Sequence, residues 1–181
     1  MSDQSKRPAV FVDRDGTLIE EVNFLSNVEN LKIFPFTRTA LETLQRNGYL
    51  VIVVTNQSGI GRKIYDTEAM NAIHKQMTYE LPGLIDAFYH CPHLPFDGCS
   101  CRKPGLGMIE AARDEFSIDM RGSWMIGDKI IDVETGFNAG IRTGLVRTGY
   151  GLSHEAKLER QPDIVADDLS GVVERMLTLS G

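Results

Sequence analysis

The sequence lacks any apolar segment long enough to cross a membrane as a helix. Its longest aliphatic run, Tyr49 to Val54, spans six residues, whereas a membrane-spanning helix needs about 20. The start of the chain, Met1 to Pro8, has no apolar core of the kind that a secretory signal carries. These absences predict a cytoplasmic protein that does not bind membranes.

Basic charge and cysteine are also scarce. Lys and Arg number 19 against 25 Asp and Glu, for a net charge of −6, which argues against a broad nucleic-acid-binding surface. An anionic substrate must therefore be held in a local cationic pocket. The three cysteines all fall between Cys91 and Cys101, so a disulfide framework is not expected. With 181 residues and no repeats, the chain has the size of one domain, and we expect residues 1–181 to form it as a monomer.

Apolar runs and helical periodicity alternate along the chain. Short apolar runs predict strands over residues 9–12, 50–54, 84–89, 123–126, 143–146 and 163–166. Apolar residues at helical spacing predict helices over residues 36–47, 66–81, 107–115, 132–139 and 169–179. Strands and helices that alternate at this spacing form a parallel sheet with helices on both faces. The sequence therefore predicts a three-layer α/β fold.

Polar residues directly follow three of the predicted strands. Asp13 and Asp15 follow the first, residues 55–56 the second, and Asp128 the fourth. Ligands of such sheets lie beyond the carboxyl ends of the strands, so we expect one site there. Asp13 and Asp15 point the same way in an extended segment, while Arg14 points elsewhere. An isolated Asp-x-Asp is more commonly a turn, but three converging carboxylates suit Mg²⁺.

A short loop contains every cysteine of the chain. It holds three thiols and one imidazole within eleven residues: Cys91, His93, Cys99 and Cys101. This set matches a closed tetrahedral Zn²⁺ site, in which four protein ligands make the metal structural. His90 is the alternative imidazole, but it is expected to end a strand. Reduced thiols beside an incidental histidine, or a noncatalytic zinc-stabilised interaction protein, are the other interpretations. Because the loop leads into Arg102 and Lys103, a zinc that fixes these cations fits the sequence better.

Four segments carry the remaining polar motifs, in a fixed order. They are Asp13-Arg14-Asp15-Gly16-Thr17, Thr55-Asn56-Gln57, Lys103-Pro104 and Gly127-Asp128-Lys129-Ile130-Ile131-Asp132. Together they resemble the haloacid dehalogenase superfamily of phosphotransferases over about residues 9–150. The resemblance implies a Rossmann-like fold, a nucleophilic Asp13 that forms an aspartyl-phosphate, and Asp15 as general acid and then base. It also implies that Thr55 and Lys103 hold phosphoryl oxygens, and that Mg²⁺ binds Asp13, Asp128 and the backbone carbonyl of Asp15.

Two charged residues near Asp128 allow more than one interpretation. Asp132 lies four residues after Asp128 and either orients metal-bound waters or supplies a negative charge at the start of a helix. Lys129 either contacts the substrate or pairs with neighbouring acids. Ser58, Gly59 and Gly61 are expected to shape a loop after the second strand.

The cysteine loop narrows the resemblance to one group within the superfamily. Residues 90–93 and 99–104 are similar to the zinc-loop phosphatases, which comprise heptose-1,7-bisphosphate 7-phosphatases and histidinol-phosphate phosphatase domains. Both groups lack a large cap domain, and segments 17–36 and 59–66 are too short to form one. Ser58 follows Gln57 as in the heptose enzymes, where the histidinol-phosphate domains have aspartate. Asn23-Phe24 departs from the Gly-Tyr that is common in the heptose enzymes.

The resemblance therefore predicts a Mg²⁺-dependent phosphatase that removes the 7-phosphate of a heptose 1,7-bisphosphate. The alternative is a histidinol-phosphate phosphatase, in which Glu20 or Glu21 would face the amine of the substrate. Arg102 is the candidate for the remote phosphate of a bisphosphate, because a guanidinium binds phosphate bidentately. The residues expected to contact this small phosphorylated substrate are Glu21, Asn23, Phe24, Asn56, Gln57, Ser58, Arg102 and Lys129.

Overall fold

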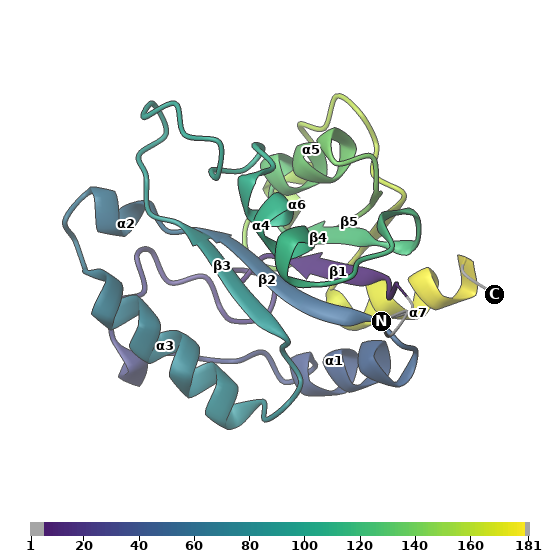
Figure 1. Cartoon of the computed structure of the whole chain (residues 1–181), viewed down its shortest axis with the longest axis horizontal. Helices are drawn as coiled ribbons and strands as arrows, with labels where there is room; N and C mark the ends of the chain where they lie inside the picture. Colours follow the sequence, from purple (N-terminus) through teal and green to yellow (C-terminus); the bar gives the residue numbers. More distant parts are fainter. Residues whose placement is uncertain (1–5, 180–181) are drawn as a thin grey trace.

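A computed structural model describes residues 6–179. Most of the segment in which no secretory signal is expected, residues 1–5, lies outside the described residues. Six parallel strands form one sheet in the order β3-β2-β1-β4-β5-β6 (Figure 1). The strands are β1 (Ala9–Val12), β2 (Leu50–Asn56), β3 (Ala87–Cys91), β4 (Trp124–Gly127), β5 (Arg142–Val146) and β6 (Ile164–Ala166). The predicted parallel α/β sheet is confirmed.

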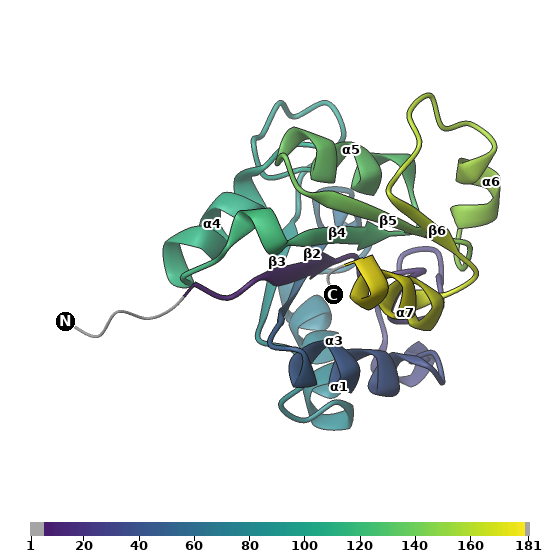
Figure 2. The ribbon, with the colours of Figure 1, turned by 90° about the vertical axis from the view of Figure 1, so that its right-hand side faces the viewer.

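Helices cover both faces of the sheet (Figure 2). The helices are α1 (Thr37–Arg46), α2 (Ser58–Gly61), α3 (Thr67–Glu80), α4 (Gly107–Glu115), α5 (Ile130–Asn138), α6 (Gly151–Glu155) and α7 (Leu169–Leu179), with short 3-10 turns η1 (Val28–Asn30) and η2 (Met120–Gly122). Helices α1, α3 and α7 lie on one face, and α4 and α5 lie on the other. Side chains alternate along β1, so Val10 and Val12 join the core under α1 and α7, while Phe11 joins the core under α4.

Some boundaries differ from the prediction. Strand β3 begins at Ala87 and ends at Cys91, three residues after the predicted start. Its position is set by parallel pairing of Ala87 with Ile52 and of Cys91 with Asn56. Helix α5 begins two residues early, and short helices α2 and α6 occupy segments with no predicted helix. Within the described residues, segments 17–36 and 58–66 contain only short elements, so no large cap domain is inserted there.

The strand order places a crevice between β1 and β4. From β1 the chain proceeds to β2 on one side and returns to β4 on the other, and ligands of open α/β sheets bind at such a switch point. The carboxyl ends of β1, β2 and β4 therefore point toward one region. Across residues 6–179, no helix has the length and apolar run needed to cross a bilayer.

Candidate active site

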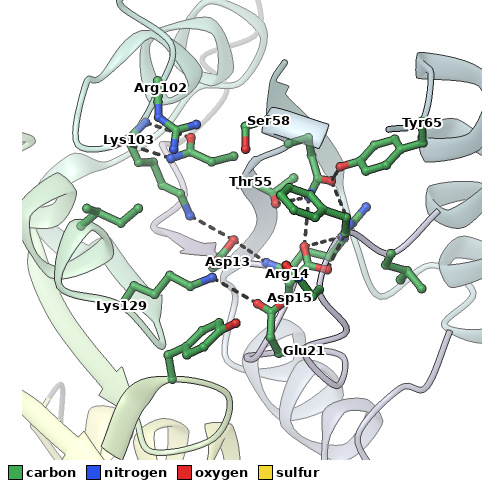
Figure 3. A pocket seen from close by; sticks show the side chains of 17 residues that line it. Asp13, Arg14, Asp15, Glu21, Thr55, Ser58, Tyr65, Arg102, Lys103 and Lys129 are labelled. Carbon is green, nitrogen blue, oxygen red and sulfur yellow. Dashed lines mark hydrogen bonds and ion pairs between the residues drawn. The ribbon is translucent and has the colours of Figure 1, made fainter. Parts of the chain in front are cut away.

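A pocket opens at the carboxyl ends of β1 and β2 (Figure 3). Its walls contain twelve of the residues that the sequence singled out: Asp13, Asp15, Glu21, Asn23, Phe24, Thr55, Asn56, Gln57, Ser58, Arg102, Lys103 and Lys129. Asp128 and Asp132 are fully buried behind this wall. The structure thus brings the predicted site residues together from five separate segments of the chain.

Asp13 and Lys103 form the centre of the pocket. Lys103 Nζ lies 3.0 Å from Asp13 Oδ1 and 2.6 Å from Asp132 Oδ1. Burial opposes ionisation of Asp13, but Lys103 and Lys129 offset it, so the pKa of Asp13 lies below its usual value. Burial disfavours the charged form of Lys103, yet Asp13 and Asp132 more than compensate and raise the pKa of this lysine. Both groups therefore carry their charges at neutral pH.

Asp128 contributes a buried oxygen that lacks a hydrogen-bond donor. Its Oδ2 accepts from Tyr150 N at 2.9 Å, whereas Oδ1 has no hydrogen-bond partner among the described residues. Burial, together with the charge of Asp13, raises the pKa of Asp128 to about 8. Carboxylate oxygens of Asp13, Asp128 and Asp132 lie within 4.8 Å of one another. Lys129 Nζ lies 3.8 Å from Oδ1, too far for a hydrogen bond. A hard divalent cation fits this acidic cluster, because it would bind that oxygen and offset the repulsion between the carboxylates.

Asp132 fills one of the two roles considered for it and adds an unexpected one. Its Oδ2 accepts from the backbone N of Lys129 at 3.0 Å, so it caps the start of α5. Its Oδ1 accepts from Lys103 Nζ. With both oxygens engaged by protein donors, Asp132 acts on the pocket through Lys103.

Arg14 was predicted to point away from the site, but it lines the pocket. Its guanidinium folds back onto Asp15, with Nε 3.0 Å from Oδ2 and Nη2 3.1 Å from Oδ1. It is also 1% exposed, and Nη2 donates to Gln57 Oε1 at 3.0 Å. The i and i+2 rule correctly separated Arg14 from Asp13, but it cannot describe a side chain long enough to curl back onto its neighbour.

The side-chain amides of Asn56 and Gln57 form hydrogen bonds with other groups of the protein. Asn56 Oδ1 accepts from Lys103 N at 3.0 Å, and Asn56 Nδ2 donates to Lys103 O at 3.3 Å. Gln57 Nε2 donates to Asp15 Oδ2 and to Thr55 Oγ1, at 3.0 and 2.8 Å. Its Oε1 accepts from Arg14 and from the hydroxyl of Tyr65. Both residues were expected to bind substrate; both line the pocket, and their amides also hold Lys103 and Asp15.

The opposite wall carries paired charge and aromatic surface. Lys129 Nζ lies 3.2 Å from Glu21 Oε2 and 5.1 Å from the centre of the Tyr150 ring. Burial disfavours the charged form of Lys129, but Asp13, Asp128 and Glu21 raise its pKa. Burial is also the main reason why the pKa of Glu21 is raised. Phe24 adopts the left-handed conformation with φ 57°, which is rare for a bulky residue.

The cysteine loop brings its four candidate ligands together. Cys91 Sγ lies 3.1 Å from Cys101 Sγ and 3.6 Å from Cys99 Sγ, and His93 Nδ1 lies 3.2 Å from Cys101 Sγ. All four ligand atoms fall within 4.8 Å of one another. Zinc–ligand bonds of about 2.0–2.3 Å place tetrahedral ligands about 3.3–3.8 Å apart. Two of the observed separations, 3.1 and 3.2 Å, are slightly shorter than this range, and the cluster is compatible with zinc. It contains His93 and not His90.

Arg102 connects this loop to the pocket. Its Nη1 donates to the backbone oxygen of His93 at 3.2 Å, and its side chain lines the pocket beside Lys103. Figure 3 shows Arg102 at the outer edge of the pocket, above Lys103. This position suits contact with a part of the substrate remote from Asp13.

Sequence reasoning missed four residues that matter to the site. Arg14 and Tyr65 line the pocket together with Tyr150, and His74 on α3 lies behind Arg14, with Nε2 3.1 Å from Arg14 Nη1. The only sequence signal for His74 was its place among Met70, Ile73 and Met77 on the buried side of a helix.

Comparisons with known proteins agree with this geometry. The family model described as HAD-hydrolase-like matches residues 100–172, and that described as polynucleotide kinase 3 phosphatase matches residues 9–135. The D-glycero-D-manno-heptose-1,7-bisphosphate 7-phosphatase of Thermosynechococcus vestitus is 35% identical over 95% of this chain and 96% of its own length. The D-glycero-beta-D-manno-heptose-1,7-bisphosphate 7-phosphatase of Escherichia coli is 35% identical, with 90% of each chain covered.

A solved structure extends the likeness to three dimensions. The D,D-heptose 1,7-bisphosphate phosphatase of B. bronchiseptica, crystallised with magnesium and phosphate, has a TM-score of 0.86 and 32% identity over 94% of this chain and 99% of its own. The predicted resemblance to the haloacid dehalogenase superfamily is therefore confirmed. On this sequence identity and coverage, the chain belongs to the D-glycero-D-manno-heptose-1,7-bisphosphate 7-phosphatase family of the haloacid dehalogenase-like hydrolases.

Proposed function

We propose that the protein is a Mg²⁺-dependent phosphatase that removes the 7-phosphate of D-glycero-D-manno-heptose 1,7-bisphosphate. The observation that carries the proposal is the buried pair of Asp13 and Lys103, 3.0 Å apart at the end of β1. It sets an ionised nucleophile beside a fixed cation. The named activities of the Thermosynechococcus and Escherichia coli relatives support the choice of substrate.

The first half-reaction transfers the phosphoryl group to Asp13. A carboxylate oxygen of Asp13 attacks phosphorus, and the bond between phosphorus and the oxygen of the sugar breaks. Asp15 gives its carboxyl proton to the departing sugar oxygen, so the heptose leaves as an alcohol. Lys103 and Thr55 hold the phosphoryl oxygens, where a preorganised charge and hydroxyl stabilise the transition state.

The second half-reaction hydrolyses the aspartyl-phosphate. Asp15, now a carboxylate, takes a proton from water while the water oxygen attacks phosphorus. The bond between phosphorus and Asp13 breaks, which releases inorganic phosphate and restores the Asp13 carboxylate. Asp15 is again protonated and ready for the next substrate. One carboxyl group thus serves both half-reactions.

Asp13, Asp128 and the backbone carbonyl of Asp15 would hold Mg²⁺. When bound, the ion would neutralise phosphoryl charge and offset repulsion between the carboxylates. Asp128 Oδ1 supports this assignment, because it is buried, accepts no hydrogen bond among the described residues and has only Lys129 Nζ at ion-pair distance, 3.8 Å away. The magnesium and phosphate in the B. bronchiseptica structure support it as well.

We further propose that Cys91, His93, Cys99 and Cys101 bind one structural Zn²⁺. The bonds from Arg102 to His93 O and from Asn56 to Lys103 would then transmit the rigidity of the loop to the pocket. Arg102 would bind the 1-phosphate, which lies at the far end of the substrate. Lys129, Asn23, Phe24 and Ser58 would contact the sugar between the two ends.

The alternative substrate, histidinol phosphate, is less well supported. Its cationic amine would need a free carboxylate, and Glu20 and Glu21 were the candidates. Glu21 already has Lys129 Nζ 3.2 Å away, whereas the exposed Glu20 pairs with Lys32 at 3.5 Å. We also propose that residues 1–181 act as a single cytoplasmic domain and as a monomer, without a nucleic-acid or membrane partner.

A phosphate-release assay with the two substrates tests the proposal. We expect kcat/KM for the heptose bisphosphate to exceed that for histidinol phosphate by at least about 100-fold, the equivalent of 2.7 kcal/mol. The Arg102→Ala variant should lose about 10- to 100-fold on the bisphosphate, because a charge-assisted hydrogen bond contributes about 1.5–3 kcal/mol, and little on a monophosphate. Equal losses on both, or faster release from histidinol phosphate, would overturn the choice of substrate.

A further inference from the structure

Behind Asp15 lies a layer of polar residues that no step of the proposed reaction uses; three of them, Arg14, Gln57 and His74, are buried, and Tyr65 is half-buried. Arg14 comes from the turn after β1, Gln57 from the end of β2, Tyr65 from the segment before α3, and His74 from the middle of α3. Figure 3 shows Arg14, Tyr65 and Asp15 grouped on one side of the pocket, away from Lys103 and Lys129. Burying a guanidinium is unfavourable unless its charge is paired and its N–H donors are hydrogen-bonded. The burial of Arg14 therefore needs an explanation.

The hydrogen bonds around Asp15 are unequal. Oδ2 accepts from Arg14 Nε and from Gln57 Nε2, both at 3.0 Å. Oδ1 accepts only from Arg14 Nη2, at 3.1 Å, among the described residues. A carboxylate oxygen has two lone-pair sites. Oδ2 is therefore saturated, while Oδ1 keeps one position that can carry a proton.

The same hydrogen bonds fix Arg14. Its planar fork binds the two oxygens of Asp15, Nη2 also donates to Gln57, and Nη1 is left for His74. Because an arginine can only donate, His74 Nε2 must accept, which places the imidazole proton on Nδ1. Burial, and then the charge of Arg14, lowers the pKa of His74 to about 3. The imidazole stays neutral, and its stacking on Phe88 at 4.4 Å holds its plane.

We propose that His74, acting through Arg14, is a positioning residue that makes Oδ1 of Asp15 the proton-carrying oxygen of the reaction. Gln57 completes the arrangement by saturating Oδ2. The inference rests on the proposed function, since it assigns a role to the proton-transfer residue of that reaction. His74 does not line the pocket, so its substitution alters no direct contact with substrate.

If His74 positions Asp15, the effect of its substitution on kcat/KM should depend on the leaving group of the substrate. A sugar oxygen must be protonated as it leaves, whereas p-nitrophenolate leaves as a stable anion without a proton. The parameter kcat/KM covers the steps up to formation of the aspartyl-phosphate, so it reports proton donation and not the later hydrolysis. Loss of Asp15 positioning should therefore lower kcat/KM for a sugar phosphate much more than for p-nitrophenyl phosphate.

The test compares His74→Phe with His74→Gln on heptose 1,7-bisphosphate and p-nitrophenyl phosphate. Phe keeps the ring that stacks on Phe88 but offers Arg14 no acceptor, whereas Gln restores one. General acid–base catalysis contributes about 10²–10⁴-fold, so we expect His74→Phe to lose at least about tenfold on the sugar phosphate. On p-nitrophenyl phosphate it should change by less than about threefold, and His74→Gln should recover most of the loss.

Ser123→Ala is the matched control for a general loss of folded enzyme. Ser123 is buried at the opposite end of the strands, where its Oγ accepts from Ala9 N and donates to Asp119 O. This variant should change both substrates by the same factor. If His74→Phe does not fold, Arg14→Lys gives the same test, because it keeps the charge and removes the fork.

Two results would overturn the inference while leaving the proposed function intact. One is an equal loss of kcat/KM on both substrates in His74→Phe and Arg14→Lys. The other is a kcat/KM for the sugar phosphate that stays at the wild-type value in both variants. A wild-type protein that hydrolyses neither substrate would overturn the proposed function, and this inference would fall with it.

Discussion

Asp132 Oδ1 lies 2.6 Å from the Nζ of Lys103, so the first turn of α5 holds the lysine that follows the cysteine loop. The two residues are 29 positions apart in the chain, and both are buried. The carboxylate also accepts from Lys129 N. One buried side chain thus links the start of a helix to the centre of the pocket.

Asp132→Asn should therefore lower both the free energy of unfolding and the rate of the phosphatase reaction. The amide has one acceptor oxygen for two donors, Lys103 Nζ and Lys129 N, and its NH₂ would face a donor. Breaking a buried pair costs about 3–5 kcal/mol, which urea unfolding can measure. Glu42→Gln is the control, because it removes only the exposed pair with Arg46 and should cost less than about 1 kcal/mol. Equal losses in the two variants would contradict this role.

Asp13→Asn should abolish turnover and leave the fold intact. The amide has the same size as the carboxylate but lacks the nucleophilic charge, so kcat should fall by at least about 10³-fold. Circular dichroism should show wild-type secondary structure. Activity within tenfold of wild type would rule out Asp13 as the nucleophile.

Acid should destabilise the protein through His74. Its pKa is about 3 in the folded state and about 6.5 when unfolded, so the unfolded chain binds the extra proton between these values. The contribution of the neutral His74 to the free energy of unfolding is complete above about pH 6.5 and is lost as the pH falls toward 3. Between pH 6.5 and 5 this amounts to about 2 kcal/mol. Urea unfolding at the two pH values should show this difference between wild type and His74→Phe; identical pH dependence would contradict it.

Chelation of divalent metal should abolish phosphatase activity, and Mg²⁺ should restore it. Mg²⁺ at 100 times its Kd should also stabilise the wild-type fold by about 2.7 kcal/mol. Asp128→Ala removes the carboxylate whose Oδ1 accepts no hydrogen bond among the described residues, so thermal unfolding of this variant should respond far less to Mg²⁺. Full activity in excess EDTA would contradict the metal assignment.

Elemental analysis should find one zinc per chain. Cys99→Ser should lose the metal and loosen the loop that carries Arg102 and Lys103, so activity should fall although no zinc ligand contacts substrate. Arg102 is tied to His93, which makes the loss larger for the bisphosphate than for a monophosphate. If the protein loses zinc and keeps full activity on both substrates, the loop has no role in catalysis and the prediction is wrong.

The sequence was sufficient to predict the sheet and the place of the site. Each strand is a short apolar run. Asp13 and Asp128 directly follow β1 and β4, and Thr55 is the penultimate residue of β2, so all three lie where the carboxyl ends of the strands meet at one edge. This inference needs only chain order and the geometry of parallel sheets. The late start of β3 was not predictable, because parallel pairing with β2 sets its register.

The arrangement behind Asp15 could not be predicted in the same way. It depends on how long side chains from four segments meet, and neither spacing nor periodicity describes such contacts. Gln57 illustrates the difference. Its place after a strand predicted a position at the pocket, which it occupies, but nothing in the sequence indicated that its amide would make four hydrogen bonds inside the protein. Likewise, Asp132 was placed near Asp128 by helical spacing, but nothing in the sequence indicated that it would bind Lys103.

Phosphorus NMR of the products most directly tests the central claim that the protein removes the 7-phosphate of the heptose bisphosphate. With heptose 1,7-bisphosphate and Mg²⁺, the resonance of the 7-phosphate should disappear as inorganic phosphate grows. The resonance of the 1-phosphate should remain unchanged, and Asp13→Asn should leave both in place. Loss of the 1-phosphate resonance, or no release from the bisphosphate at all, would contradict the account.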